Sequence, residues 1–392
     1  MNISDIKLDK QNSAKVAIVC VGYNRIRSIK RLLTSLLNSK YPNYDIPLVI
    51  SIDCSGDNEL YSYVQQFKWP YGKKYVNIQQ ERLGLKEHIY KCGDLTSLFK
   101  AIILLEDDLY VSPYFYSYVI STLEKYESDE RIAQISLYKN ERNGYVGLPF
   151  SNVQNGFDVF LMQDVSTWGQ CWTKSMWDAF KIWRDTHSEE YIQTVDLPDT
   201  IKGWTRAWSK YYNAYVVDCK KYVLYPNIPL TTNFSDAGEH GGDNHSVVQV
   251  NLLQEDFKYR LCDFEELVKY DIYFNNEDLY KWLGISRKDL CLDIYGFHDN
   301  NSRYILSTKI LPYRIIKSFA LNMRPIELNV KYDIEGSGLF LYDSSVTDDS
   351  KKIKKEYHSD VVPYFLEGFN IKLLLKYLLR YYSYAFIRKI KR

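Results

Sequence analysis

The first third of the chain alternates strand-like runs with segments of helical periodicity. The runs with the length and composition of buried strands are KVAIVCV (15–21), PLVISID (47–53), KYVNIQQ (74–80), AIILLE (101–106) and RIAQISL (131–137). Between them, helical spacing of apolar residues is seen in 25–39, 57–68, 84–99 and 113–127. This alternation predicts an α/β fold, in which a Rossmann-type, mostly parallel sheet is flanked by helices.

Polar groups follow three of these predicted strands. GYNR (22–25) comes after the first, Asp53 ends the second, and Glu106, Asp107 and Asp108 end the fourth. Ligands of such sheets bind beyond the carboxyl ends of the strands, so these groups are expected to share one crevice. Three adjacent carboxylates repel one another unless a divalent cation neutralises them, and oxygen ligands suit Mg²⁺ or Mn²⁺. The alternative is a solvated, acid-rich turn.

Composition excludes some partners and predicts a location. Lys and Arg total 50 against 49 for Asp and Glu, so no net charge draws the chain to nucleic acid. The seven cysteines lack CxxC or Cys/His metal spacing, which is typical of reduced thiols in a cytoplasmic protein. Residues 1–14 lack the apolar core of a signal peptide, and no run approaches the ~20 apolar residues of a membrane span.

The remainder of the chain predicts two further regions after a first domain of 1–250. Residues 251–346 are expected to form an accessory α+β region, and 347–392 a charged linker with a basic amphipathic helix. The segment 370–392 has no acid and seven basic residues, and its apolar positions are Leu, Ile, Tyr and Phe. This pattern favours contact with an anionic inner membrane face. The alternative is a helix docked on the protein itself.

The order of the motifs resembles the GT-A-fold glycosyltransferases, and most closely the N-acetylglucosaminyltransferase I-like group. The resemblance is carried, over roughly residues 15–245, by IVCVGYNRIRSIKRLL, PLVISIDCSGDNE, ILLEDDLYVSPYF, the WGQCW region and TTNFSDAGEHG. It implies a metal-dependent enzyme that moves a hexosyl or N-acetylhexosaminyl group from a UDP-linked sugar to a saccharide, with inversion. The expected acceptor is a lipid-linked oligosaccharide of a surface polysaccharide.

The resemblance also implies roles for individual residues. Arg25 and Asp53 would hold the nucleobase, Glu106 would lie near the ribose, and Asp107 would face the donor sugar. Asp108 would be the direct protein ligand of Mn²⁺, with diphosphate oxygens and water completing its coordination. The remaining expected donor contacts are His88, Ser235 and His240, the last two in a Gly-rich loop that would fold over the diphosphate. Each residue has a structural alternative, such as a turn cap for Asp53 or an ion pair for Arg25.

The acceptor end of the site departs from the family pattern. There, an acid pair before a tryptophan supplies the general base, but in DTIKGWTRAW (199–208) Lys202 and Gly203 precede Trp204. Asp199 is the first candidate base, Asp164 the second and Asp236 the third, since a base must reach the acceptor hydroxyl. Trp168 is expected to stack on a sugar, whereas Trp172 is expected in the core. The missing acids leave inversion or retention open.

Two other functions remain alternatives. A nucleotidyltransferase that makes nucleotide sugars also uses strand-end acids and Mg²⁺. It usually carries a Gly-rich phosphate loop with a basic residue after the first strand, and VGYNRIR (21–27) lacks that loop. The second alternative is a catalytically degenerate protein that only binds glycan or membrane, which the missing acid pair favours.

Overall fold

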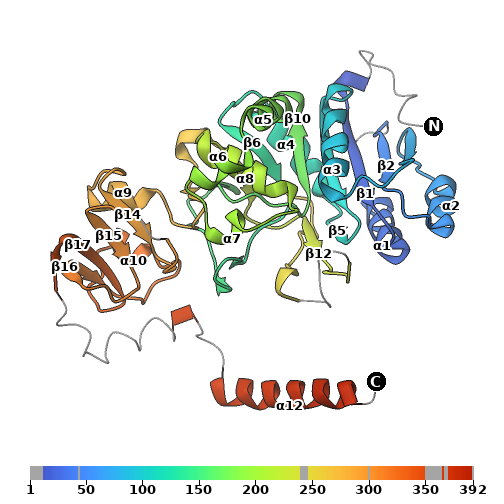
Figure 1. The fold of residues 1–392 in the computed structure, drawn as a ribbon. Coiled ribbons are helices and arrows are strands. Elements are labelled where there is room, and N and C mark those ends of the chain that lie inside the picture. The colour runs from blue at the N-terminus through green and yellow to red at the C-terminus, as the bar shows by residue number, and fades with distance from the viewer. Residues whose placement is uncertain are drawn as a thin grey trace. The chain divides into compact units, whose positions relative to one another are not determined.

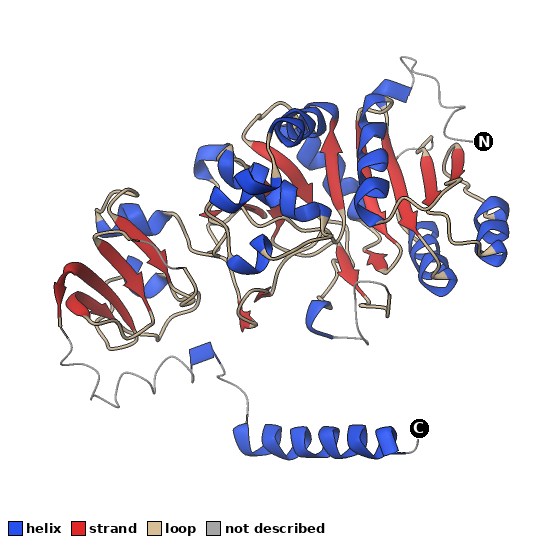
Figure 2. Cartoon of the chain, viewed as in Figure 1, coloured by secondary structure: helices blue, strands red, loops and turns tan. Residues whose placement is uncertain are grey.

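The chain folds into two compact units, which divide between Lys281 and Trp282 (Figure 1). The computed structural model describes residues 12–42, 45–238, 246–298, 301–348, 364–365 and 370–390. The first unit is built on a nine-stranded sheet in the order β13-β9-β11-β6-β10-β4-β1-β2-β3. Helices lie along this sheet (Figure 2), so the predicted α/β class with a mostly parallel sheet is confirmed.

The bounds of the first unit's elements follow in chain order. Its strands are β1 (Val16–Gly22), β2 (Leu48–Ile52), β3 (Lys74–Ile78), β4 (Ala101–Glu106), β5 (Leu109–Val111), β6 (Ile132–Ser136), β7 (Arg142–Asn143), β8 (Leu148–Pro149), β9 (Val159–Met162), β10 (Gln170–Thr173), β11 (Tyr222–Pro226), β12 (Thr231–Asn233) and β13 (Lys269–Tyr270). Its α-helices are α1 (Ile26–Leu37), α2 (Asn58–Gln66), α3 (Leu85–Gly93), α4 (Phe115–Tyr126), α5 (Lys174–Thr186), α6 (Glu189–Thr194), α7 (Asp199–Lys202) and α8 (Trp208–Asp218), and α9 (Asp278–Leu283) crosses the boundary.

The five predicted strands and four predicted helices of the first third are all present. β1 is central and buried along its whole length, and it pairs in parallel with both β2 and β4. The carboxyl ends of these three strands therefore meet at one edge of the sheet. The antiparallel strand β10, between β4 and β6, was not predicted, because it is short and lies in a segment of irregular pattern.

An aromatic cluster fixes the elements that border this edge. Trp172 of β10, Trp177 of α5 and Trp208 of α8 are at most 2% exposed. The Trp172 ring centroid lies 4.7 Å from that of Trp177 and 5.6 Å from that of Trp208. Each such ring removes roughly 150–250 Å² from water, which ties α5 and α8 firmly to the sheet. The prediction that Trp172 is a core residue is confirmed.

The boundary between the units falls later in the chain than the expected one at residue 250. Residues 251–281 lie within the first unit. There, β13 extends the large sheet by pairing in parallel with β9, with Lys269 opposite Leu161. The difference arises because this two-residue strand is too short to leave a periodic signal. All seven cysteines are free thiols, as predicted.

The second unit contains a four-stranded sheet in the order β14-β15-β17-β16. Its elements are β14 (Leu290–Asp293), β15 (Tyr304–Ser307), β16 (Tyr313–Phe319), α10 (Leu328–Lys331), β17 (Leu339–Thr347) and the terminal helix α12 (Ile371–Ile390). The side chains of residues 372–383 in α12 are exposed, Leu379 at 73%. Among the described helices, none combines the length and the apolar character needed to cross a bilayer.

Candidate active site

A cavity of about 420 Å³ opens at the carboxyl ends of β1, β2 and β4. It is lined by most of the predicted site residues, namely Arg25, Asp53, His88, Glu106, Asp107, Asp108, Trp168, Ser235 and Asp236. Strand ends, the turn before β10, the start of α8 and the segment after β12 all contribute to its wall. The expected crevice is therefore present at the expected edge of the sheet.

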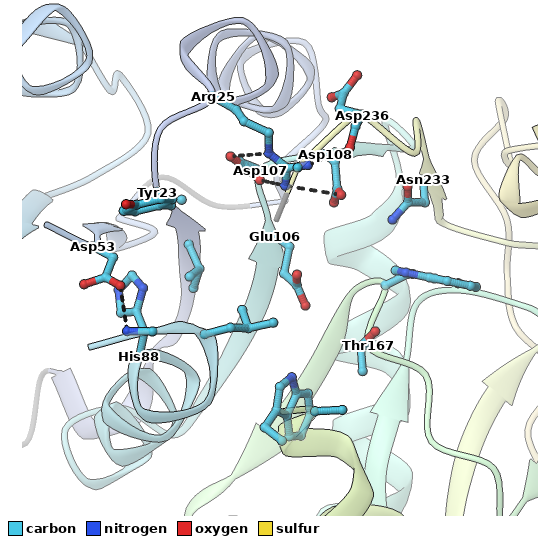
Figure 3. A pocket seen from close by; sticks show the side chains of 18 of the residues that line it. Tyr23, Arg25, Asp53, His88, Glu106, Asp107, Asp108, Thr167, Asn233 and Asp236 are labelled. Carbon is cyan, nitrogen blue, oxygen red and sulfur yellow. Dashed lines mark hydrogen bonds and ion pairs between the residues drawn. The ribbon is translucent and has the colours of Figure 1, made fainter. Parts of the chain in front are cut away.

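Arg25 neutralises part of the acidic cluster (Figure 3). Its Nε donates to Asp107 Oδ2 at 3.2 Å, and a terminal nitrogen binds the other oxygen of that carboxylate. The same nitrogen lies 3.3 Å from Asp108 Oδ2, and the other donates to the Asp236 carbonyl at 3.0 Å. These contacts correspond to the ion pair that was given as the structural alternative for Arg25. Its contact with a nucleobase stays a prediction.

Asp108 has the character expected of a metal ligand. Its Oδ1 is buried and has no hydrogen-bond partner, although buried polar atoms normally have one. Burial raises the pKa of this carboxyl, and Arg25 opposes the rise. Within the described residues, no group of three His, Cys, Asp or Glu side chains gathers into a metal site. A cation at Asp108 would thus draw its other ligands from substrate and water, as the resemblance implies.

Burial disfavours the ionised forms of the Glu106 and Asp107 carboxyls. Burial raises the pKa of Glu106 to about 8, and the neighbouring charges of Asp108 and Asp107 add to the rise. Burial also raises the pKa of Asp107 to about 6, against the opposing effect of Arg25. Figure 3 shows the Glu106 carboxyl directed into the cavity between His88 and Thr167. The free site therefore disfavours ionisation of these carboxyls, and a bound cation would favour it.

Asp53 and His88 form the wall on the α3 side. The Asp53 carboxylate accepts hydrogen bonds of 2.9 Å from the backbone N–H groups of Leu83 and Gly84, which fixes the turn that enters α3. His88 is buried, and its Nε2 lies 2.7 Å from the Ser51 hydroxyl. Burial lowers the pKa of His88 to about 4, so the ring is neutral near pH 7. Both residues have the structural role given as their alternative, and both also border the cavity.

The segment after β12 is bound to α1 through Asp236. Ser28 Oγ donates to its carboxylate at 2.6 Å, and Arg31 forms an ion pair with it. Burial alone would raise the pKa of Asp236, but these two partners outweigh it and lower the pKa. Ser235, at a φ of 51°, lines the cavity beside it. His240 lies outside the described residues.

The first two candidate bases do not line the cavity. Asp199 is exposed at the start of α7. Asp164 is held by Asn140 Nδ2 at 2.9 Å and by the Tyr145 hydroxyl. Burial raises the Asp164 pKa to about 6, and both hydrogen bonds oppose that rise. The roles of Asp199 and Asp164 as bases stay predictions, whereas Asp236 does border the cavity.

The residues that border the cavity precede the second tryptophan of WTRAW, not the first. Arg206 and Ala207, directly before Trp208, line the cavity, whereas Lys202 and Gly203 do not. The repeated tryptophan in WTRAW was the available signal, because the second Trp opens α8 and the first precedes it. An arginine and an alanine thus occupy the cavity-facing positions that precede the helix.

Residues 2–190, just under half of the chain, match the model of the GNT-I family. This part of the chain is similar to the GNT-I family. The match confirms the resemblance that the motifs carry. No curated protein matches the sequence.

The solved structures that match this chain are distant from it. S. aureus TarS 1–349 in complex with UDP-GlcNAc is 14% identical, with a TM-score of 0.39, over 58% of this chain and 60% of that one. GalNAc-T7 with UDP, GalNAc and Mn²⁺ is 13% identical (TM-score 0.38), over 56% of this chain and 43% of that one. The Pyrobaculum calidifontis mannosyltransferase PcManGT with GDP-Man and Mn²⁺ is 11% identical (TM-score 0.35), over 57% and 60%.

Proposed function

We propose that this protein is a glycosyltransferase, which moves a sugar from a UDP-linked donor to a hydroxyl of a saccharide acceptor, with Mn²⁺ or Mg²⁺ bound by Asp108. The observation that carries the proposal is the buried, unpartnered Oδ1 of Asp108 at a strand end inside the cavity. When bound, the cation would neutralise charge on the departing diphosphate. A nucleotidyltransferase is less well supported, because residues 22–25 provide no Gly-rich phosphate loop.

The remaining residues divide between donor and acceptor. Asp53 and Glu106 border the part of the cavity assigned to the nucleoside, His88 the part assigned to the donor's phosphate or sugar, and Asp107 the part assigned to the donor sugar. Trp168 is assigned to the acceptor because it lines the cavity and its half-buried ring can pack on a sugar. Asp236 is retained as the base, since it alone of the three candidates borders the cavity. It must leave Arg31 to accept a proton, and direct displacement would then invert the anomeric centre.

The cavity predicts a metal-dependent thermal response to nucleotides. We expect UDP with Mn²⁺ to raise the melting temperature, because a ligand that binds only the folded state stabilises it. At a free concentration 100 times its Kd, the gain is about 2.7 kcal/mol. Differential scanning fluorimetry with UDP, GDP, ADP and CDP, each with Mn²⁺ or with EDTA, measures it. A flat panel would instead favour the catalytically degenerate alternative.

We also propose that α12 binds an anionic membrane surface. The side chains of this helix are described for residues 372–383, where leucine and tyrosine side chains are exposed together with Lys372, Lys376 and Arg380. Apolar burial at the interface and attraction to anionic headgroups add to each other. Such contact suits a lipid-linked oligosaccharide acceptor in surface polysaccharide synthesis, at the cytoplasmic membrane face.

Deletion of residues 370–392 is expected to abolish vesicle binding. The full chain should float with vesicles that contain about 30% anionic lipid, because each Lys or Arg near such a surface contributes about 1 kcal/mol. The truncated protein should stay at the bottom of the gradient, and neutral vesicles serve as the control. Equal flotation of both proteins would exclude α12 as the membrane contact.

A further inference from the structure

The start of α8 places a free cation at the cavity. Arg206 is exposed and lines the cavity next to Trp208. Within the described part of the chain, Arg206 forms no ion pair, whereas Arg25 is bound to Asp107 and Asp108. A guanidinium in this state is available to a ligand that carries an anion.

The helix itself adds donors at the same place. α8 has eleven residues, and its N-cap residue, Ala207, has no side chain that can cap it. The first N–H groups of a helix lack carbonyl partners, and they carry the positive end of the helix dipole. Trp208 and Ser209, which supply the first two of these N–H groups, both line the cavity. Such a helix start favours a phosphate or similar oxyanion.

Ser209 is a second, independent indication of a ligand. It is only 7% exposed and lines the cavity, yet its hydroxyl has no hydrogen bond within the described residues. A hydroxyl in this state is available to a ligand in the cavity. Arg206, Ser209 and the uncapped helix start thus offer charged and neutral donors to one space, with no acceptor from the described protein.

The loop that carries these groups is held in place. Lys210 is buried, forms an ion pair with Glu189 and donates to the Lys202 carbonyl at 2.7 Å. The Trp208 ring packs edge-on against Trp172, which follows the Trp168 turn in the chain. The start of α8 is therefore fixed at the wall of the cavity that Trp168 also lines. Donors fixed in this way bind an anion without first losing conformational freedom.

We propose that Arg206, Ser209 and the start of α8 bind a phosphate group of the acceptor. This inference rests on the proposed function and narrows the acceptor to a phosphorylated saccharide or a sugar–phosphate chain. The other source of a phosphate is the donor diphosphate, which the cation at Asp108 would already neutralise. Arg206 supplies the positive charge, and the Ser209 hydroxyl and the backbone N–H groups supply hydrogen-bond donors at fixed positions.

Calorimetry on the full chain tests the proposal with inorganic phosphate as the probe. Phosphate is titrated into protein saturated with UDP and Mg²⁺, and separately into protein without nucleotide. We expect Arg206→Gln to weaken phosphate binding about tenfold or more, because a charge-assisted hydrogen bond is lost. Ser209→Ala should weaken it less. Neither change should alter the affinity for UDP and Mg²⁺ by more than about twofold.

Arg27→Gln is the matched control, because Arg27 is an exposed arginine of α1 that does not line the cavity. Unchanged melting temperatures would establish that all variants fold. Absent phosphate binding, or equal binding by Arg206→Gln and the wild type, would overturn the inference. If Arg206→Gln weakens UDP binding as strongly as phosphate binding, the site holds the donor diphosphate. Failure of the wild type to bind UDP would overturn the proposed function, and the titration without nucleotide would still decide the phosphate site.

Discussion

Asp108→Asn is expected to abolish metal-dependent UDP binding while leaving the protein folded. The substitution removes the anionic oxygen that is buried without a partner, Oδ1, and keeps the shape of the side chain. Removing a group that only orients a metal ligand typically lowers metal affinity about 10- to 100-fold. Removing the ligand itself should therefore lower the affinity for metal-bound UDP at least about 100-fold. Calorimetric titration of UDP in the presence of Mn²⁺ measures the change.

The fold should survive this substitution. Burial raises the pKa of the Asp108 carboxyl, which means that its ionised form is unfavourable in the folded protein. A neutral amide removes that penalty, so the melting temperature without metal should stay the same or rise. Asp185→Asn, an exposed carboxylate of α5, is the matched control. Unchanged UDP–Mn²⁺ affinity in Asp108→Asn would show that the metal assignment is wrong.

Glu106→Gln is expected to stabilise the metal-free protein at alkaline pH. The pKa of this carboxyl rises from an ordinary value of 4.5 to about 8 in the folded state. Between these values the folded state keeps a proton that the unfolded state has released, so stability falls as the pH rises from 4.5 to 8. Glutamine has no charge to form. Above pH 8 it should therefore add about 1–3 kcal/mol to the free energy of unfolding.

The pH dependence is what distinguishes this effect. Urea unfolding in EDTA at about pH 5 and pH 9 measures the free energy of unfolding of Glu106→Gln and of the wild type. We expect the two proteins to differ little at about pH 5 and strongly at about pH 9. Glu124→Gln, an exposed glutamate of α4, should behave as the wild type at both. A stabilisation of equal size at the two pH values would contradict the electrostatic explanation and indicate better packing instead.

Local sequence was sufficient for the sheet edge that holds the acids. The strand-length apolar runs and the helical spacing between them are properties of neighbouring residues, and parallel strands bring their carboxyl ends together whatever the loops do. For this reason, Glu106, Asp107, Asp108 and Asp53 were expected at one crevice and line one cavity. The short strands β10 and β13 were not predicted, because segments of four and two residues leave no detectable period.

The partners of each site residue depended on contacts between distant parts of the chain. Arg25 meets Asp107 across 82 positions, and Ser28 meets Asp236 across 208. His88 reaches Ser51 across 37 positions, and its burial lowers the pKa of the ring so that it is neutral near pH 7. Residue type and neighbours cannot supply these pairings, because each follows from the packing of whole elements against one another.

The sequence by itself determined the fold class, the edge of the sheet at which the cavity lies and the acids that lie there. Periodicity and strand ends are local, and they specify these features before the chain is packed. Only the tertiary structure decided that Asp199 and Asp164 stand away from the cavity, while Arg206 and Ser209 border it. The positions of Arg206 and Ser209 depend on where α8 begins, and the packing of Trp208 against Trp172 fixes that point.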